Sequence, residues 1–247
     1  MTLLPVTPTL GVVIAFLLLA ATAVAALGKL GHGWAVLGSG GRAALQLGVV
    51  SLLIAWIVRH GLLVAVFVLV MYGVAARTAG RRVTRDRTSW WAAAPIAAGT
   101  GPVIALLLAT GLVPPRGIVL IPVSGILIGG ALTATALSGR RALDELHQRH
   151  GEHEAALSIG LSDRDAAMEI CRTAASTALI PALDQTRTVG LVTLPGAFVG
   201  MLLGGASPVA AGAVQLFVLI GLLATEAIAI LVTIELIARG RITPSPR

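Results

Sequence analysis

The stretch Glu152-His153-Glu154-Ala155-Ala156-Leu157-Ser158-Ile159-Gly160-Leu161-Ser162-Asp163 is a polar segment between two long apolar blocks. Its pattern predicts a short helix, a glycine turn and the start of a second helix. Gly160 is the residue type that ends a helix with positive φ. Ser162 and Asp165, three residues apart, match a capping box. We therefore expect a helical connection outside a hydrophobic bundle.

Composition places the rest of the chain in a membrane. The 247 residues are 56% hydrophobic and 12% charged, and the mean hydropathy is +0.93. Soluble domains carry roughly 25% charged residues. The net charge of +7 is better explained by cytoplasmic Lys and Arg than by nucleic acid, which we do not expect as a partner. Cys171 is the lone cysteine, so no internal disulfide can form, and we expect it to be buried.

Apolar runs predict an all-α bundle of seven membrane-spanning helices in a single domain, residues 1–247. The first run has an Ala23-Val24-Ala25 sequence like a signal cleavage site, but no Lys or Arg precedes it, so we interpret it as a retained span. Lys29 to Arg42 is expected to be a Gly-rich connection. The expected spans cover residues 10–27, 44–58, 61–76, 91–112, 118–139, 189–204 and 213–238, with a coupling loop at 150–165.

The distribution of basic residues predicts the orientation. Five arginines lie between Arg77 and Arg87, and Trp90 and Trp91 follow at the next membrane entry, as interfacial aromatics do. With that loop in the cytoplasm, the N-terminus is outside, the C-terminus is inside, and sixteen of the eighteen Lys and Arg are cytoplasmic, all except Arg59 and Arg116. The fifth span is expected to continue as a helix to about His150, and an amphipathic segment, Asp165 to Leu179, is expected to end at Pro181.

Several motifs carry a family resemblance. Glu154-Ala155-Ala156 followed by Gly160 resembles the EAA loop of ABC-transporter membrane subunits, which docks on the ATP-hydrolysing subunit. The block Thr188-Val189-Gly190-Leu191-Val192-Thr193-Leu194-Pro195-Gly196, with Ile121-Pro122-Val123-Ser124-Gly125 before it and Arg42-Ala43-Ala44-Leu45-Gln46-Leu47 in the first half, resembles the FetB-type iron-export permease family. The plant aluminium-tolerance permease of the STAR system is a relative of that family.

The resemblance implies a multi-pass permease of the cytoplasmic (inner) membrane that is not itself an enzyme. It implies a homodimer, two copies of a FetA-like ATPase, and ATP with Mg on that partner, so that this chain binds no cofactor. The implied activity is export of iron or related metal cations by alternating access. Ile126 and Gly130 stand where the family has Met and Asn, which removes soft and amide ligands from the pathway. A nucleotide sugar or another organic solute therefore remains an alternative substrate, and a stand-alone channel or secondary carrier an alternative class.

Candidate site residues form three groups. The ATPase-coupling group comprises Glu152, His153, Glu154, Ala155, Ala156, Gly160, Leu161 and Ser162. The hinge group comprises Pro181, Asp184, Arg187, Pro195 and Gly196. The substrate-pathway group comprises Gln46, Thr193, Met201, Gln215 and Glu226, and no metal ligand is assigned.

Each candidate has a structural alternative. Glu226 lies near the middle of the last span, where a carboxylate costs about 2.5–3.5 kcal/mol, so it must face the bundle interior as a cation or proton site or as a hydrogen-bonded acid. Glu235 and Arg239 are expected to form a surface ion pair, and Asp184 and Arg187 to pair across one helix turn. His147, His150 and His153 could ligate a metal, but a solvated helix extension is favoured.

Overall fold

The computed structural model describes residues 7–112 and 117–244. The described chain forms two units, Met1–Arg59 and His60–Arg247. Six helices in it are long and apolar enough to cross a membrane. Arg116, one of the two arginines expected outside, lies beyond the described residues.

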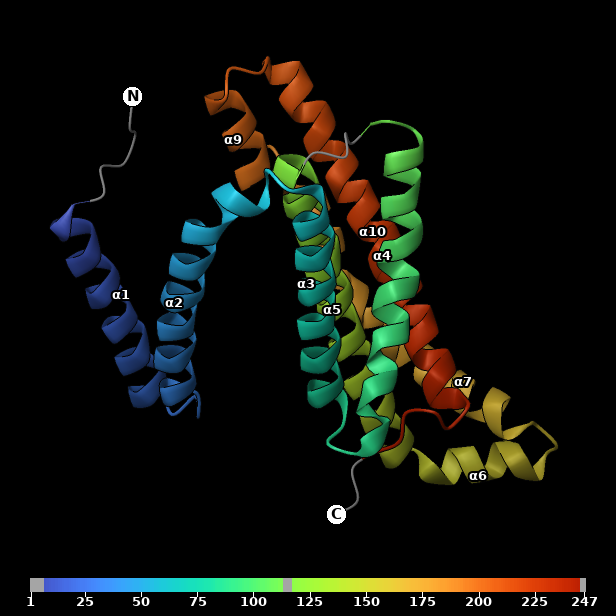
Figure 1. Cartoon of the computed structure of the whole chain (residues 1–247). Coiled ribbons are helices and arrows are strands. Elements are labelled where there is room, and N and C mark those ends of the chain that lie inside the picture. The colour runs from blue at the N-terminus through green and yellow to red at the C-terminus, as the bar shows by residue number, and fades with distance from the viewer. Residues whose placement is uncertain (1–6, 113–116, 245–247) are drawn as a thin grey trace. The chain divides into compact units, whose positions relative to one another are not determined.

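The first unit is a pair of antiparallel helices, α1 (Pro8–Leu27) and α2 (Gly33–Ile57) (Figure 1). Gly40 permits their close contact, since a Cβ there would lie 2.5 Å from a methyl carbon of Leu18. The expected Gly-rich connection from Lys29 to Arg42 is wrong over most of its length, because α2 already begins at Gly33. Glycine is common in membrane helices, whose backbone groups have no water to bind instead.

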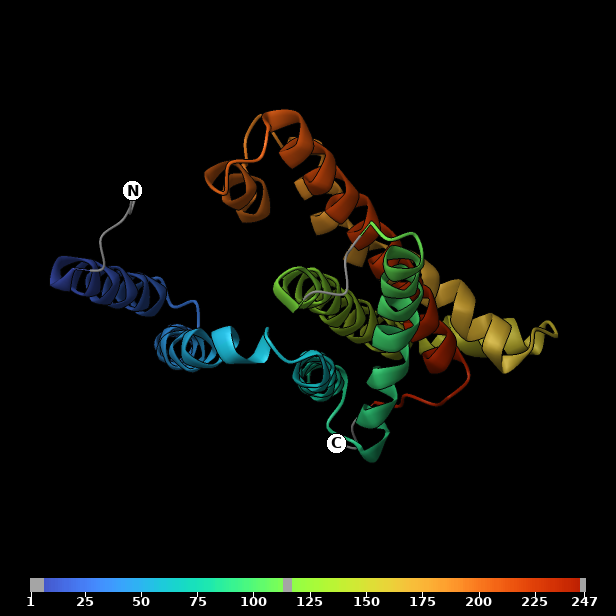
Figure 2. The same ribbon diagram turned by 45° about the horizontal axis from the view of Figure 1, so that its top comes forward.

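The second unit is organised around α5 (Gly117–Gln148), which packs against α3 (Gly61–Val83), α4 (Ala93–Ala109) and α10 (Pro208–Ala238). Figure 2 shows α5 between these three helices. Small residues allow the close packing that holds helices together in lipid. Buried alanines recur along the contacts, and a Cβ on Gly99 of α4 would lie 2.5 Å from the carbonyl oxygen of Thr225 on α10.

The predicted sixth span, residues 189–204, was expected to be interrupted at Leu194-Pro195-Gly196, and it does not form a helix of membrane-spanning length. The chain instead forms α8 (Ile180–Thr188), a turn in which the amide of Gly190 donates to the carbonyl of Thr193 at 2.8 Å, and α9 (Gly196–Leu203). The 8 residues of α9 extend about 12 Å, against the ~30 Å of a hydrocarbon layer. The break follows from Pro195, which caps α9 from outside in an extended conformation.

One end of the second unit carries the polar elements. There α5 runs on to Gln148, and α6 (His150–Ser158) lies across the end of the bundle (Figure 1). The arginine-rich end of α3 lies at the same end. After Gly160, with φ +96°, the chain forms α7 (Asp163–Ser176), a 3₁₀ turn η2 (Thr177–Leu179) and α8. Pro181 therefore does not end the amphipathic segment but sits in the first turn of α8, where proline is tolerated.

Candidate functional site

The carboxyl group of Glu226 borders a cavity inside the second unit. Glu226 is on α10 and only 7% exposed, as expected for a residue facing the interior. The cavity measures about 310 Å³ and lies between α5, α10 and the η2–α8 segment. Within the part of the chain that the structure describes, no hydrogen bond or ion pair is formed by the Glu226 carboxyl group. The cavity is therefore the place where a bound solute can supply a partner to Glu226.

Small residues make room for this cavity. A Cβ on Gly130 would lie 2.8 Å from Oε1 of Glu226 and 2.3 Å from a methyl carbon of Leu222, so a side chain there would force these two groups to move. Thr133 of α5 and Gln185 of α8 add a hydroxyl and an amide at the exposed side of the cavity. Neither residue was predicted as a site residue, because the sequence does not show which helix each segment packs against. The lining residues include no Lys or Arg.

Three other predicted pathway residues of the second unit, Gln215, Thr193 and Met201, do not border the Glu226 cavity. Gln215 is buried at 6% exposure with its side-chain oxygen unpaired among the described residues, but it borders a separate cavity of about 170 Å³ beside α9. Thr193 is exposed in the turn before α9, and Met201 is half-buried on α9. Gln46 is exposed on α2 of the first unit.

Side chains of the expected coupling segment are mostly exposed. No residue of α6 is buried, and Glu152, Glu154, Ala155, Gly160 and Ser162 are all exposed, whereas His153, Ala156 and Leu161 are half-buried. Arg149 pairs with Glu152, which lowers the pKa of that carboxyl group through a direct hydrogen bond. His150 lies 3.3 Å from Glu154, and His153 lies 3.3 Å from Asp163. The segment is thus an accessible surface helix held in place by its own ion pairs.

Ser162 caps the start of α7, which is the first half of the predicted capping box. The Ser162 hydroxyl accepts a hydrogen bond from the Asp165 amide at 3.1 Å and donates to the Asp165 carboxylate at 2.7 Å. This hydrogen bond, followed by the ion pair with Arg164, lowers the pKa of Asp165. Gly160 has the predicted positive φ, so the change of direction between α6 and α7 depends on a residue without a side chain.

An ion-pair group joins α7 to α10. Arg164 donates to both oxygens of Glu235 at 2.8 and 2.7 Å, and Arg239 donates to Oε1 of Glu235 at 2.5 Å. The Glu235–Arg239 pair was predicted from the i,i+4 spacing and is confirmed. Spacing along the chain could not predict the contact of Arg164, because this residue lies 71 residues from Glu235.

The expected hinge residues fall on α8 and at the start of α9. Asp184 and Arg187 pair at 3.8 Å on α8, as predicted, and both are exposed. Pro181 borders the Glu226 cavity, and Pro195 with Gly196 marks the start of α9. Residues of α8 therefore border the cavity beside Glu226, whereas residues of the turn between α8 and α9 border the cavity beside Gln215.

The described residues contain no group of three or more His, Cys, Asp or Glu side chains placed to hold a metal ion. His150 and His153 face one another with ring centroids 6.5 Å apart and pair with carboxylates, as a solvated helix does. Cys171 is fully buried against α5, as expected, with its sulfur 3.8 Å from the carbonyl oxygen of Ala142.

Long apolar helices, a buried carboxyl group and an exposed polar connection define a multi-span helical membrane protein with an internal cavity. Residues 9–241 match the uncharacterised protein family UPF0014. The chain therefore belongs to the UPF0014 family, which confirms the resemblance found in the sequence.

Named relatives come from plants and bacteria. The chain is 35% identical to the UPF0014 membrane protein STAR2 of Oryza sativa subsp. japonica over 72% of its own length and 64% of that protein. It is 34% identical to the protein ALUMINUM SENSITIVE 3 of Arabidopsis thaliana over 72% of its length and 66% of that protein. Against the "Probable iron export permease protein FetB" of Escherichia coli it is 31% identical over 83% of its length and 80% of that protein. The chain spans just under two thirds of the two plant relatives, and no solved structure matches it.

Proposed function

We propose that this chain is the membrane permease subunit of an ATP-driven ABC transporter that exports iron or related metal cations. The cavity beside Glu226 is the observation that supports this substrate class. A carboxylate oxygen, a hydroxyl and an amide oxygen are ligands for a partly hydrated cation. A nucleotide sugar carries two phosphate groups, which proteins bind with Lys, Arg or backbone amides, and the cavity presents no Lys or Arg. The printed name of the bacterial relative FetB supports the same substrate class.

In this proposal the ATPase is a separate chain that docks on α6. The helix has no buried residue and ends in an exposed Ile159, 80% accessible, which supplies apolar surface for a cleft in a partner. Movement of α6 and α7 reaches α10 through the pair between Arg164 and Glu235, and α10 also carries Glu226. ATP and Mg belong to the partner chain, and this subunit performs no chemistry on them.

The transporter is proposed to be a homodimer with the N-terminus outside, the C-terminus inside and α8 with α9 acting as a broken seventh crossing. Discontinuous helices in transporters line cavities near the middle of the bilayer. The exposed side of the Glu226 cavity, at Thr133 and Gln185, cannot face lipid without a large cost to the carboxylate. A second copy of the chain, covering that side, removes this cost and brings two carboxyl groups to one pathway.

Reconstitution tests this function. A tagged chain isolated from its native membrane is expected to bring down an ATPase without membrane spans. In proteoliposomes, Fe²⁺, Co²⁺ or Ni²⁺ should raise the ATPase rate of the wild-type complex and not that of Glu226→Gln. Thr225→Val is the matched control, because its buried hydroxyl is unpaired among the described residues. A rate that responds to a nucleotide sugar and to none of the three metals would reject metal export, and recovery of the chain without any ATPase would reject the ABC class.

A further inference from the structure

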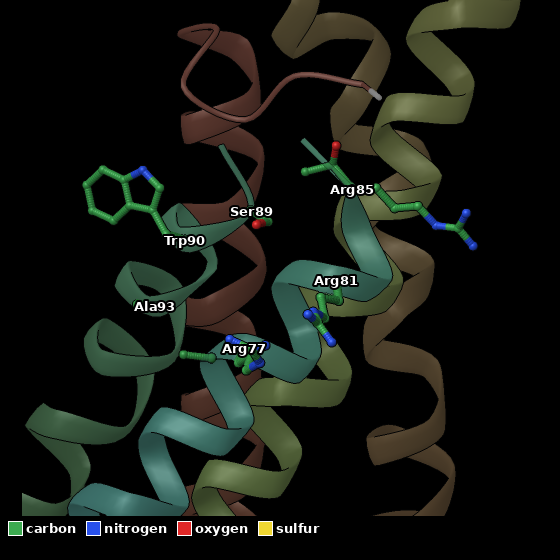
Figure 3. A pocket seen from close by; sticks show the side chains of 8 residues that line it. Arg77, Arg81, Arg85, Ser89, Trp90 and Ala93 are labelled. Carbon is green, nitrogen blue, oxygen red and sulfur yellow. The ribbon is translucent and has the colours of Figure 1, made fainter. Parts of the chain in front are cut away.

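A basic pocket lies at the arginine-rich end of α3, away from the Glu226 cavity. It measures about 920 Å³ and is bordered by Arg77, Arg81 and Arg85 on one side and by Ser89 and Trp90 of the 3₁₀ helix η1 (Arg87–Ala92) on the other. Figure 3 shows Arg77 and Arg81 near each other on α3, whereas the guanidinium group of Arg85 extends away from Trp90. Two neighbouring cationic groups of α3 therefore border the pocket together with Trp90, whose indole ring is turned away from them in Figure 3.

The pocket is built into the packing of α3 against η1 and α4. Gly80 lets the two segments touch, since a Cβ there would lie 2.2 Å from the carbonyl oxygen of Ser89. The Tyr72 hydroxyl donates to the carbonyl of Ala93 at 2.9 Å, which fixes the start of α4 beside α3. Ala76 and Ala93 leave the space between the helices open. Arg77 and Arg81 therefore lie on a helix that is packed against η1 and α4, whereas Arg85 lies in the bend between α3 and η1.

Two of the pocket's arginines, Arg77 and Arg81 on α3, carry charge that no described carboxylate neutralises. Arg77 and Arg81, one turn apart, are both exposed, and no carboxylate of the described residues lies within ion-pair distance of either. Asp86, the acidic residue of this loop, instead accepts hydrogen bonds from the amide of Thr88 and the hydroxyl of Thr243. Two like charges one helix turn apart repel each other, and an anion between them removes that repulsion.

We propose that this pocket binds the phosphate group of an anionic phospholipid headgroup. Guanidinium groups bind phosphate oxygens in pairs of hydrogen bonds, and two arginines on one helix side provide such forks. Trp90 is 64% exposed and stacks on Trp91 at 4.3 Å, and exposed tryptophan beside a membrane helix is typical of the headgroup level. A free phosphate ion would use the arginines alone, whereas the glycerol and upper acyl chain of a lipid also cover the indole and the alanines.

Placement and size agree with a lipid. The pocket lies where the candidate spans α3 and α4 meet at one end of the bundle, and basic pockets between helices bind anionic headgroups. Its volume is near the upper end of the roughly 300–1,000 Å³ range of small-molecule sites. The proposal is independent of the cargo at Glu226, so a failure of metal export leaves it standing.

The test compares lipid retention by purified protein in detergent, measured by native mass spectrometry and by thermal stabilisation. Phosphatidylglycerol is the probe, and phosphatidylcholine and inorganic phosphate are the comparison ligands. The double variant Arg77→Gln/Arg81→Gln is compared with Arg82→Gln/Arg87→Gln, which loses the same net charge from exposed residues outside the pocket. Trp90→Leu removes the indole without changing the charge.

We expect the wild type and the Arg82/Arg87 variant to retain phosphatidylglycerol, and the Arg77/Arg81 variant to retain it about tenfold less. Trp90→Leu should weaken retention with unchanged helix content, which keeps the proposal testable if the double variant folds poorly. Equal losses in the two double variants would overturn the site in favour of general surface charge. Stabilisation by inorganic phosphate equal to that by phosphatidylglycerol would overturn the lipid as its source.

Discussion

Arg164 and Glu235 form a bidentate pair across 71 residues of sequence, with Nε to Oε1 at 2.8 Å and Nη2 to Oε2 at 2.7 Å. The pair is a polar connection between the start of α7 and the long α10. Both side chains are partly accessible, at 45% and 28%, so we expect the pair to contribute less than about 1 kcal/mol to folding. We therefore interpret the pair as a link between α7 and α10 and not as a major source of folding stability.

Arg164→Ala or Glu235→Ala should therefore change the unfolding temperature little and reduce transport per ATP hydrolysed, and the double variant should lose no more than either single one. The measurement is a double-mutant cycle on both quantities in proteoliposomes. Arg187→Ala is the control, because its pair with Asp184, at 3.8 Å, lies within one helix. Transport that stays normal in both single variants would show that motion reaches α10 by another contact.

The turn at Gly160 gives a second prediction with an internal control. A Cβ on Gly160 or on Gly151 would meet no atom within 4 Å, but only Gly160 has a positive φ, +96°. Gly160→Ala should lower the stability of the α6–α7 connection by about 1 kcal/mol, and Gly151→Ala, within α6, should raise it by up to about 1 kcal/mol. Hydrogen exchange of α6 measures both changes, and equal effects of the two alanines would contradict the backbone argument.

The same connection carries the coupling prediction. Glu154→Arg replaces an exposed acidic group that lies 3.3 Å from His150, and Gly160→Val adds a β-branched residue at positive φ. Both should leave the subunit assembled in membranes and uncouple ATP hydrolysis from transport. Transport assays on inverted vesicles, with assembly followed by co-purification, distinguish the two effects. Normal transport by both variants would remove α6 from the coupling route.

Adjacent glycines of α5 test the cavity. Gly130→Ala places a methyl group 2.3 Å from Leu222 and 2.8 Å from the Glu226 carboxyl group, whereas Gly129→Ala meets nothing within 4 Å. Both substitutions raise helix propensity by about 1 kcal/mol. We expect Gly129→Ala to transport normally, and Gly130→Ala to lose cation-stimulated ATPase activity because the cavity wall must shift. Equal activity of the two variants would place the cation elsewhere.

Acid should loosen the start of α7. The hydrogen bond from Ser162 lowers the pKa of Asp165 in the folded chain below its usual value near 4. A carboxylate with a depressed folded pKa contributes stability above its unfolded pKa and loses it as pH falls through the folded pKa. Below about pH 4 the wild type should therefore lose the stabilisation that the ionised Asp165 provides. The Asp165→Asn variant lacks this stabilisation at every pH, so the free energies of unfolding of the two proteins should converge. Curves that stay parallel from pH 7 to pH 3 would show that Asp165 does not contribute.

Local signals predicted much of this fold. Six of the expected spans lie within helices α1, α2, α3, α4, α5 and α10 over most of their length, since an apolar run of that length has few other structures. Local sequence also predicted the positive φ of Gly160 and the helix cap at Ser162. Spacing along one helix predicted the ion pairs Glu235–Arg239 and Asp184–Arg187. The start of α2 was missed because glycine is a helix breaker in water and not in lipid. A break at Leu194-Pro195-Gly196 was expected, but the sequence did not show that residues 189–194 form a turn, so that only the short α9 remains of the expected span.

Contacts between distant helices were beyond sequence reasoning. The burial of Glu226 was expected from its cost in a membrane, but its neighbours Thr133 and Gln185 depend on which sides of α5 and α8 meet α10. The pair of Arg164 with Glu235 was missed for the same reason, because it depends on which side of α7 meets α10. The expectation that Gln215 shares a route with Glu226 has no support from the cavities, because each residue borders its own.

Because Cys171 is buried, the native protein is suited to labelling at a single engineered cysteine. The sulfur of Cys171 is enclosed between α5 and α7, and burial raises the pKa of the thiol to about 11, so a maleimide finds neither access nor thiolate there. A single engineered cysteine, at the exposed Ser158 of α6 or at the exposed Val209 near the opposite end of the bundle, is then the one reactive thiol of the described chain. A membrane-impermeant maleimide applied to intact cells would report which of these two ends faces outward.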